Sequence, residues 1–159
     1  MLGLTGPNAA GKGEVAAYLE SRGFKLHSLS DIVREEAARS GFPPEREHLI
    51  RTGNLLRRKS GPEALARSII PRLGSRDVVD SIRNPAEVAA LRELPYFVLV
   101  GVTASREARF RRSVARRRPG DPRTLDEFVE RESQENSTDP EAQQLDATFR
   151  LADHVLRND

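Results

Sequence analysis

The side chains best suited to chemistry lie near the start of the chain, in the stretch LTGPNAAGKGE at residues 4–14. Gly6 to Lys12 has the spacing G-x-x-x-x-G-K. A glycine-rich turn lets successive backbone N–H groups converge on phosphate oxygens, and a lysine at the mouth of the next helix reaches the outer phosphates of a nucleotide. The pattern therefore predicts a nucleotide-binding loop. Its predicted contacts are Gly6, Pro7, Asn8, Ala9, Ala10, Gly11, Lys12, Gly13 and Glu14.

The position after this lysine departs from the usual pattern, in which Ser or Thr holds Mg²⁺. Gly13 has no hydroxyl, so we expect the ion to be held through water and by a carboxylate at a strand end. Asp80, which closes the stretch DVVD, is the candidate for that metal ligand. The carboxylate of Glu14 either points away from the triphosphate or helps to hold the metal shell, and the first is favoured because an acid beside phosphates is repulsive unless a cation intervenes. A plain glycine turn is the alternative, but it does not account for Lys12.

Composition narrows the class of protein. A chain of 159 residues predicts one domain, 1–159. The absence of cysteine excludes disulfides and thiolate metal sites, and the three histidines are too far apart in sequence to predict a metal site. No apolar run reaches membrane-spanning length, and the start of the chain shows no cleavage pattern. We therefore expect a cytoplasmic protein, either a monomer or a homodimer, that does not bind membranes.

Arginine supplies nearly all of the positive charge. The formal net charge is +2, and lysine occurs only as Lys12, Lys25 and Lys59. Guanidinium groups hold phosphates and carboxylates bidentately, so an anionic ligand is one explanation, and genomic composition or thermal adaptation is another. Six Phe, two Tyr and no Trp offer little surface for stacking single-stranded bases, so nucleic acid is not the expected partner.

Strand-like and helix-like segments alternate along the chain. The expected strands are 1–5, 24–29, 77–80, 96–102 and 152–159. The expected helices are 12–21, 31–40, 46–58, 62–72, one beginning at Asn84, 105–118 and 125–135. Ser30 is the expected N-cap of the second helix, Pro62 is expected in the first turn of the fourth, and Thr124 is expected to cap the last. This alternation predicts a parallel α/β sheet with right-handed crossovers.

Three stretches together, GPNAAGKGE, SLSDIVRE and VVDSIRN, resemble the adenylate kinase-like branch of the phosphate-loop kinases, including dephospho-CoA kinase-like ATP-binding proteins. The resemblance covers nearly the whole chain. It implies a three-layer phosphate-loop NTPase fold with a five-stranded parallel sheet. The core would be 1–30, 74–105 and 120–159, with a helical acceptor-binding insertion at 31–73 and a short arginine-rich lid at about 106–119.

The resemblance also implies roles for particular residues. In monophosphate kinases a D-x-x-R motif grips the acceptor, and SDIVR matches it at Asp31 and Arg34. The related motif after the central strand implies Asp80 on the metal side and Arg83 on the acceptor phosphate, although DSIR is one residue shorter and Ser81 replaces a glycine. Asn158, after the last strand, is a candidate for contact with adenine.

The stretch REARFRRSVARRR at 106–118 places Arg109, Arg112 and Arg116 on one helical face. In the family, lid arginines neutralise charge on the transferring phosphoryl group, which implies that role for Arg112 and Arg116, with Arg109 behind them. A solvated charged face is the alternative explanation of the same run. Pro119, Gly120 and Pro122 would form the edges of the lid.

Two acceptor chemistries compete. A hydroxyl acceptor, as in dephospho-CoA kinase, needs a carboxylate to take its proton, whereas a phosphate acceptor is already a nucleophile and needs cations. Arg34, Arg57 and Arg83 suit a phosphate, and Asp31 could serve as a base. We therefore expect transfer from ATP–Mg²⁺ to a small nucleotide, most simply a ribo- or deoxynucleoside monophosphate. A hydroxyl kinase, a regulatory nucleotide-binding protein without kinase activity and a polynucleotide kinase remain alternatives, and the residues do not separate ATP from GTP.

Overall fold

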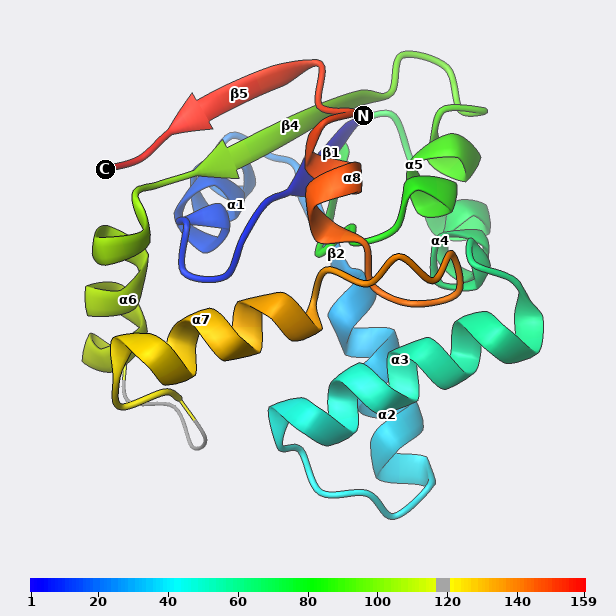
Figure 1. Cartoon of the computed structure of the whole chain (residues 1–159). Coiled ribbons are helices and arrows are strands. Elements are labelled where there is room, and N and C mark those ends of the chain that lie inside the picture. Colours follow the sequence, from blue (N-terminus) through cyan, green and yellow to red (C-terminus); the bar gives the residue numbers. More distant parts are fainter. Residues whose placement is uncertain (117–120) are drawn as a thin grey trace.

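The computed structural model describes residues 1–116 and 121–159 and is built on one parallel five-stranded sheet (Figure 1). The strands lie in the order β2-β3-β1-β4-β5, and every neighbouring pair is parallel. Their bounds are β1 Leu2–Thr5, β2 Lys25–Ser28, β3 Asp77–Asp80, β4 Val98–Thr103 and β5 His154–Arg157. The expected α/β phosphate-loop fold is confirmed.

Helices cover both faces of the sheet. Their bounds are α1 Lys12–Ser21, α2 Leu29–Arg39, α3 Arg46–Ser60, α4 Ala64–Ile69, the 3₁₀ turn η1 Ile70–Arg72, α5 Pro85–Leu91, α6 Arg106–Ala115, α7 Leu125–Gln134 and α8 Leu145–Phe149. Within the described residues no helix is long and apolar enough to cross a membrane. Residues 31–73 contain helices and no strand, as expected (Figure 1).

Successive side chains of the central strands point to opposite faces of the sheet and pack into two apolar clusters. On one face Leu4 and Val78 pack with Ala16 of α1. On the other face Val79 and Leu99 join a larger cluster from α2, α4 and α5. Each fully buried Leu or Val contributes about 1.5–3 kcal/mol, so the two clusters hold β1 and β3 rigidly between helices. This is the environment expected of continuous apolar strands.

Parallel pairing brings the carboxyl ends of the strands to one edge of the sheet. β1 pairs with both β3 and β4, so the loop that follows Thr5 lies between the ends of those two strands. Open α/β sheets bind ligands at this edge, in the crevice outside the strand ends. The register thereby places the predicted phosphate loop beside Asp80, which ends β3.

Several predicted element boundaries were wrong. α2 begins at Leu29 with Ser28 as its N-cap, so Ser30 lies inside the helix. The fourth helix begins only at Ala64, after Pro62, and it tightens into η1 because Pro71 has no N–H for an α-helical bond. β4 begins at Val98, because Tyr96 has a φ of 60° and is 91% exposed. The five-residue α8 was missed because it is too short to show a helical period.

Two predicted caps are confirmed. Asn84 accepts a bond from the N–H of Ala86 and forms a capping box with Glu87 at the start of α5. Thr124 accepts a bond from the N–H of Glu127 and caps α7. Pro119 and Gly120, two of the predicted lid edges, lie outside the described residues. The division of the chain into core, insertion and lid stays a prediction.

Candidate active site

The predicted phosphate loop depends on left-handed backbone at three positions. Gly6, Ala9 and Gly11 have φ values of 135°, 59° and 103°. A Cβ on Gly6 would lie 2.0 Å from the carbonyl oxygen of Val102, and one on Gly11 would lie 2.1 Å from Nδ2 of Asn158. Gly6 is therefore required by neighbouring backbone as well as by conformation, whereas at Gly11 the conformation favours glycine and a side chain would have to displace the Asn158 amide. The turn leads directly into α1, whose N-terminus favours anions.

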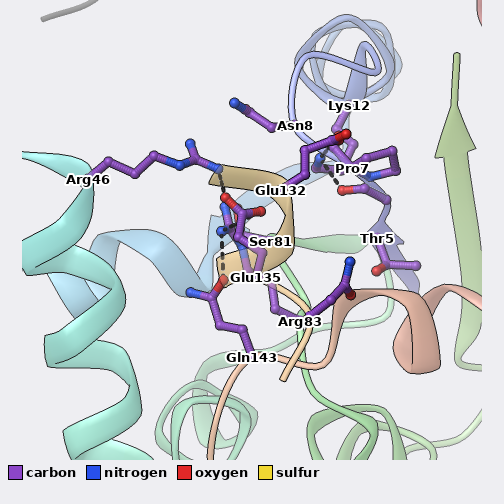
Figure 2. A network of polar contacts seen from close by, with 12 residues as sticks. Thr5, Pro7, Asn8, Lys12, Arg46, Ser81, Arg83, Glu132, Glu135 and Gln143 are labelled. Atoms are coloured by element: carbon purple, nitrogen blue, oxygen red, sulfur yellow. Dashed lines mark hydrogen bonds and ion pairs between the residues drawn. The ribbon is translucent and has the colours of Figure 1, made fainter. Parts of the chain in front are cut away.

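Lys12 folds back over this loop. Its ammonium group donates hydrogen bonds to the carbonyl oxygens of Gly6 at 2.6 Å and Pro7 at 2.9 Å (Figure 2). Burial lowers the pKa of Lys12 to about 7, against the opposing effect of the Asp80 carboxylate. Backbone carbonyls thus hold the lysine where a nucleotide would bring phosphate oxygens. An anionic ligand would replace weak acceptors by charged ones.

Gly13 and Glu14 form the first exposed turn of α1. A Cβ on Gly13 would meet nothing within 4 Å, so no packing constraint enforces the missing hydroxyl. The side chain of Glu14 is on the surface of the helix. Whether either residue contacts a nucleotide stays a prediction.

Asp80 supplies a carboxylate next to the loop. Its Oδ1 is buried without a hydrogen-bond partner among the described residues, and its Oδ2 is 3.4 Å from the hydroxyl of Ser81. Within residues 1–116 and 121–159, no three His, Cys, Asp or Glu side chains cluster as a metal site. Mg²⁺ commonly uses one or two carboxylates, with phosphates and waters for the rest, so a single orphaned carboxylate fits this ion. Ser81 has a φ of 66°, which explains why related motifs have glycine there.

A pocket beside the loop is formed by α2, α3 and the turn after β3. Its polar and charged lining is Ser30, Arg34, Arg46, Arg57, Ser81, Arg83 and Gln143. Leu29, Val33, Leu49, Ile50, Gly53 and Leu65 form its apolar wall. Among the described residues, four guanidinium groups and no carboxylate thus line a pocket with an aliphatic wall. We call it the acceptor pocket.

Arg57 is held in place by a buried ion pair with Glu87 of α5. Its Nε and Nη2 donate to Oε1 of Glu87 at 3.0 and 2.6 Å, and both side chains are at most 2% exposed. The other oxygen of Glu87 accepts the backbone N–H groups of Arg83 and Asn84. Nη1 of Arg57 is buried with no partner among the described residues. A buried donor of this kind calls for an acceptor from a ligand.

The other three predicted acceptor contacts, Asp31, Arg34 and Arg83, differ from one another. Arg83 lies at the junction of loop and pocket: its Nη1 donates to Gln143 at 3.3 Å, and burial lowers its pKa despite the nearby Asp80. Arg34 also lines the pocket, but it pairs with Asp31 at 2.7 Å on the exposed side of α2. Asp31 is 64% exposed and does not line the pocket.

The predicted lid arginines have three different environments. Arg109 is buried, donates to the carbonyl of Ala104 and pairs with Glu132, which makes it part of the packing between α6 and α7. Arg116 makes two bonds to Asp121, and its Nη1 donates to Oδ1 of Asn8 in the loop at 3.2 Å.

Arg112 completes the set: its Nη1 is buried without a hydrogen-bond partner in the described part of the chain. Of the three predicted lid arginines, Arg116 makes a hydrogen bond to the phosphate loop within the described part of the chain.

Asn158 braces the loop from the end of the sheet. Its side-chain amide donates to the carbonyl of Ala10 at 3.1 Å, and its backbone N–H donates to Thr103 at the end of β4. The residue after β5 is therefore fixed against the loop, and contact with adenine stays a prediction.

Arg46 and Glu135 were missed by the sequence reasoning. Arg46 lines the acceptor pocket and contacts the carboxylate of Glu135, which also faces Arg83 (Figure 2). One signal could have found Arg46. A cation at the first position of a helix is unfavourable next to the helix dipole, so its presence there suggests a role other than stabilising the helix. No comparable signal marks Glu135 in the polar stretch after α7.

Comparison with known proteins agrees with this architecture. A family model described as an AAA domain matches residues 2–138. A UPF0200 protein of Hyperthermus butylicus is 36% identical over 160 residues, which cover 98% of this chain and 83% of the relative.

Solved structures of similar shape include a putative kinase from Chloroflexus aurantiacus, with a TM-score of 0.61 at 19% identity over 98% of this chain and 85% of that one. A shikimate kinase from Aquifex aeolicus has a TM-score of 0.56 at 17% identity over 98% and 84%. The adenylate kinase-like and dephospho-CoA kinase-like subtypes stay predictions. The chain belongs to the UPF0200 family, and its fold is that of the phosphate-loop kinases.

Proposed function

We propose that the protein transfers the γ-phosphoryl group of ATP–Mg²⁺ to the phosphate of a small acceptor, most simply a nucleoside monophosphate. The observation that carries this proposal is the acceptor pocket, whose lining, as far as the chain is described, has four arginines and no carboxylate. The kinase-like fold supports phosphoryl transfer in general. The identity of the acceptor rests on the chemistry of the pocket.

The donor side requires a held triphosphate. Lys12 and the amide groups of the loop would bind the phosphates, and the orphaned Oδ1 of Asp80 would orient the metal-bound water. Mg²⁺, when bound, would neutralise charge on the phosphates. Arg116 reaches the loop through Asn8 and would add positive charge where the transferred group passes.

The acceptor side favours an anion over a hydroxyl. A hydroxyl acceptor requires a nearby base, but Asp31 is 64% exposed and, among the described residues, no Asp or Glu lines the pocket. Glu135, which lies beside the pocket, is already paired with Arg46 and Arg83. A phosphate acceptor is already ionised and needs cations to overcome the repulsion between anions. Arg57, whose Nη1 has no hydrogen-bond partner among the residues described, supplies them together with Arg34, Arg46 and Arg83.

A coupled ADP-release assay tests the proposal. ATP–Mg²⁺ is combined in turn with each ribo- and deoxynucleoside monophosphate and with dephospho-CoA. We expect ADP release with at least one monophosphate and none with dephospho-CoA. Release only with dephospho-CoA would establish the hydroxyl alternative. ATP binding without release across the whole panel would favour a regulatory nucleotide-binding protein.

A further inference from the structure

Glu135 lies between two arginines of the acceptor pocket. It is the residue just after α7, and its side chain is 2% exposed. One carboxylate oxygen contacts Nη2 of Arg46 at the start of α3, and the other is 3.6 Å from Nη1 of Arg83 (Figure 2). A single carboxylate thereby joins the end of α7 to both sides of the pocket.

The two positive charges of Arg46 and Arg83 exceed the single negative charge of the Glu135 carboxylate between them. Burial and the charges of Arg83 and Arg116 lower the pKa of Arg46, with Asp121 opposing them. Burial also lowers the pKa of Arg83, where Arg57 adds to the effect and Asp80 opposes it. Arg83 also donates a hydrogen bond to the side-chain amide of Gln143, which is neutral and adds no negative charge. Two half-buried guanidinium groups that share one carboxylate can accept an anion of higher charge.

Two buried glutamates lie beside the pocket, paired with arginines that line it, and they are held very differently. Glu87 accepts four hydrogen bonds, two from the side chain of Arg57 and two from the backbone N–H groups of Arg83 and Asn84. It is therefore a fixed part of the pocket. Within the described residues the carboxylate of Glu135 contacts the side chains of Arg46 and Arg83, and a ligand can take over these contacts without breaking a backbone bond.

We propose that Glu135 is a resident anion, whose carboxylate in the free protein holds the place between Arg46 and Arg83 that the acceptor's phosphate group takes on binding. This inference rests on the proposed function and specifies where the acceptor's phosphate lies. When the phosphate binds, a group of higher negative charge replaces one carboxylate between the two arginines. Glu135 then leaves Arg46, which frees the end of α7 from the start of α3.

The test measures equilibrium binding of inorganic phosphate by calorimetry, without ATP. Glu135→Gln keeps the shape of the side chain and removes its charge. Because a competing anion is lost, we expect phosphate to bind about tenfold more tightly than to the wild type. Asp126→Asn is the matched control: it removes one charge from an exposed position on the same helix, and we expect affinity within about twofold of wild type. Equal or weaker binding to Glu135→Gln would overturn the proposal.

A second series separates a resident anion from a structural brace. When Arg46 has already been changed to Gln, adding Glu135→Gln should raise phosphate affinity by less than half as much as it does in the wild-type protein. The reason is that only one of the two arginines that Glu135 pairs with, Arg83, is still present. In the kinase assay, Glu135→Gln should lower KM for the acceptor and leave KM for ATP unchanged. A brace would instead give weaker binding of both ligands. If Glu135→Gln does not fold by circular dichroism, Glu135→Asp, which draws the carboxylate back by one methylene, should give a smaller gain of the same sign.

The two failures are distinguishable. If phosphate binds more tightly to Glu135→Gln but no acceptor causes ADP release, the resident-anion proposal is supported and the proposed function is refuted. ADP release with a monophosphate, but no gain in phosphate affinity, would refute the resident anion alone.

Discussion

The donor loop and the acceptor pocket lie at the same edge of the sheet, but different forces hold them in place. The loop is a short stretch of chain whose shape depends on left-handed backbone at Gly6, Ala9 and Gly11 and on one lysine bonded to backbone carbonyls. The pocket is assembled by side chains from α2, α3 and the turn after β3, and its cations are held by carboxylates from elsewhere. The loop should therefore be sensitive to changes in single residues, and the pocket to changes in pairs.

The largest expected effect is on catalysis, at the lysine of the loop. Lys12→Met removes the ammonium group that is bonded to the carbonyl oxygens of Gly6 and Pro7, and it should lower kcat/KM by about a thousandfold or more. The fold should stay intact by circular dichroism, because no core residue changes. Lys59→Met, at an exposed position of α3, is the matched control and should retain full activity. Turnover that survives Lys12→Met would show that the loop is not the donor site.

The next effect is on stability, at the buried pair of the pocket. Glu87→Gln leaves Arg57 without its counter-charge in the interior and should lower the free energy of unfolding by about 3–5 kcal/mol. Urea denaturation measures this. Glu93→Gln disrupts the exposed Arg67–Glu93 pair and should change stability very little, since solvent screens it. Equal effects of the two substitutions would mean that the pocket does not depend on this pair.

The third effect is a pH dependence confined to the donor loop. Burial lowers the pKa of Lys12 to about 7 in the free protein, and the phosphates of ATP favour the ammonium form and raise that pKa on binding. Above pH 7, binding must therefore take up a proton, and affinity should fall by up to about tenfold per pH unit. Calorimetry between pH 7.5 and 9 measures the slope.

Lys12→Arg provides the comparison for that slope, because guanidinium stays protonated over this range. Its ATP affinity should vary much less with pH. A flat profile for the wild type would show that Lys12 is fully charged in the free protein.

The smallest effect tests the departure from the usual loop sequence. A Cβ at position 13 meets nothing within 4 Å, so Gly13→Ser should be accommodated and should restore the hydroxyl that holds Mg²⁺ in related loops. The concentration of Mg²⁺ needed for half-maximal ATP binding should fall a few-fold. Gly13→Ala, the control, should raise stability by about 0.5–1 kcal/mol without changing the Mg²⁺ requirement. Identical Mg²⁺ curves for Ser and Ala would place the ion away from this position.

The sequence by itself determined the features that depend on neighbouring residues. The alternation of apolar runs and helical periods predicted the parallel sheet, and the glycine spacing predicted the loop, because both patterns act over a few consecutive residues. The caps at Asn84 and Thr124 were predicted for the same reason. The short β-branched stretch DVVD correctly predicted that Asp80 ends a strand. Parallel pairing of that strand with β1 then places Asp80 at the same edge of the sheet as the loop.

Only the tertiary structure decided which charged side chains share an environment. Arg109 and Arg116 belong to the same predicted face of one helix, yet one is buried against Glu132 and the other reaches the phosphate loop. The grouping of Arg46, Arg83 and Glu135 joins three elements that are distant in sequence. Local spacing fixes which side chains share a face, but burial and the pairing of charges depend on the elements that pack against that face.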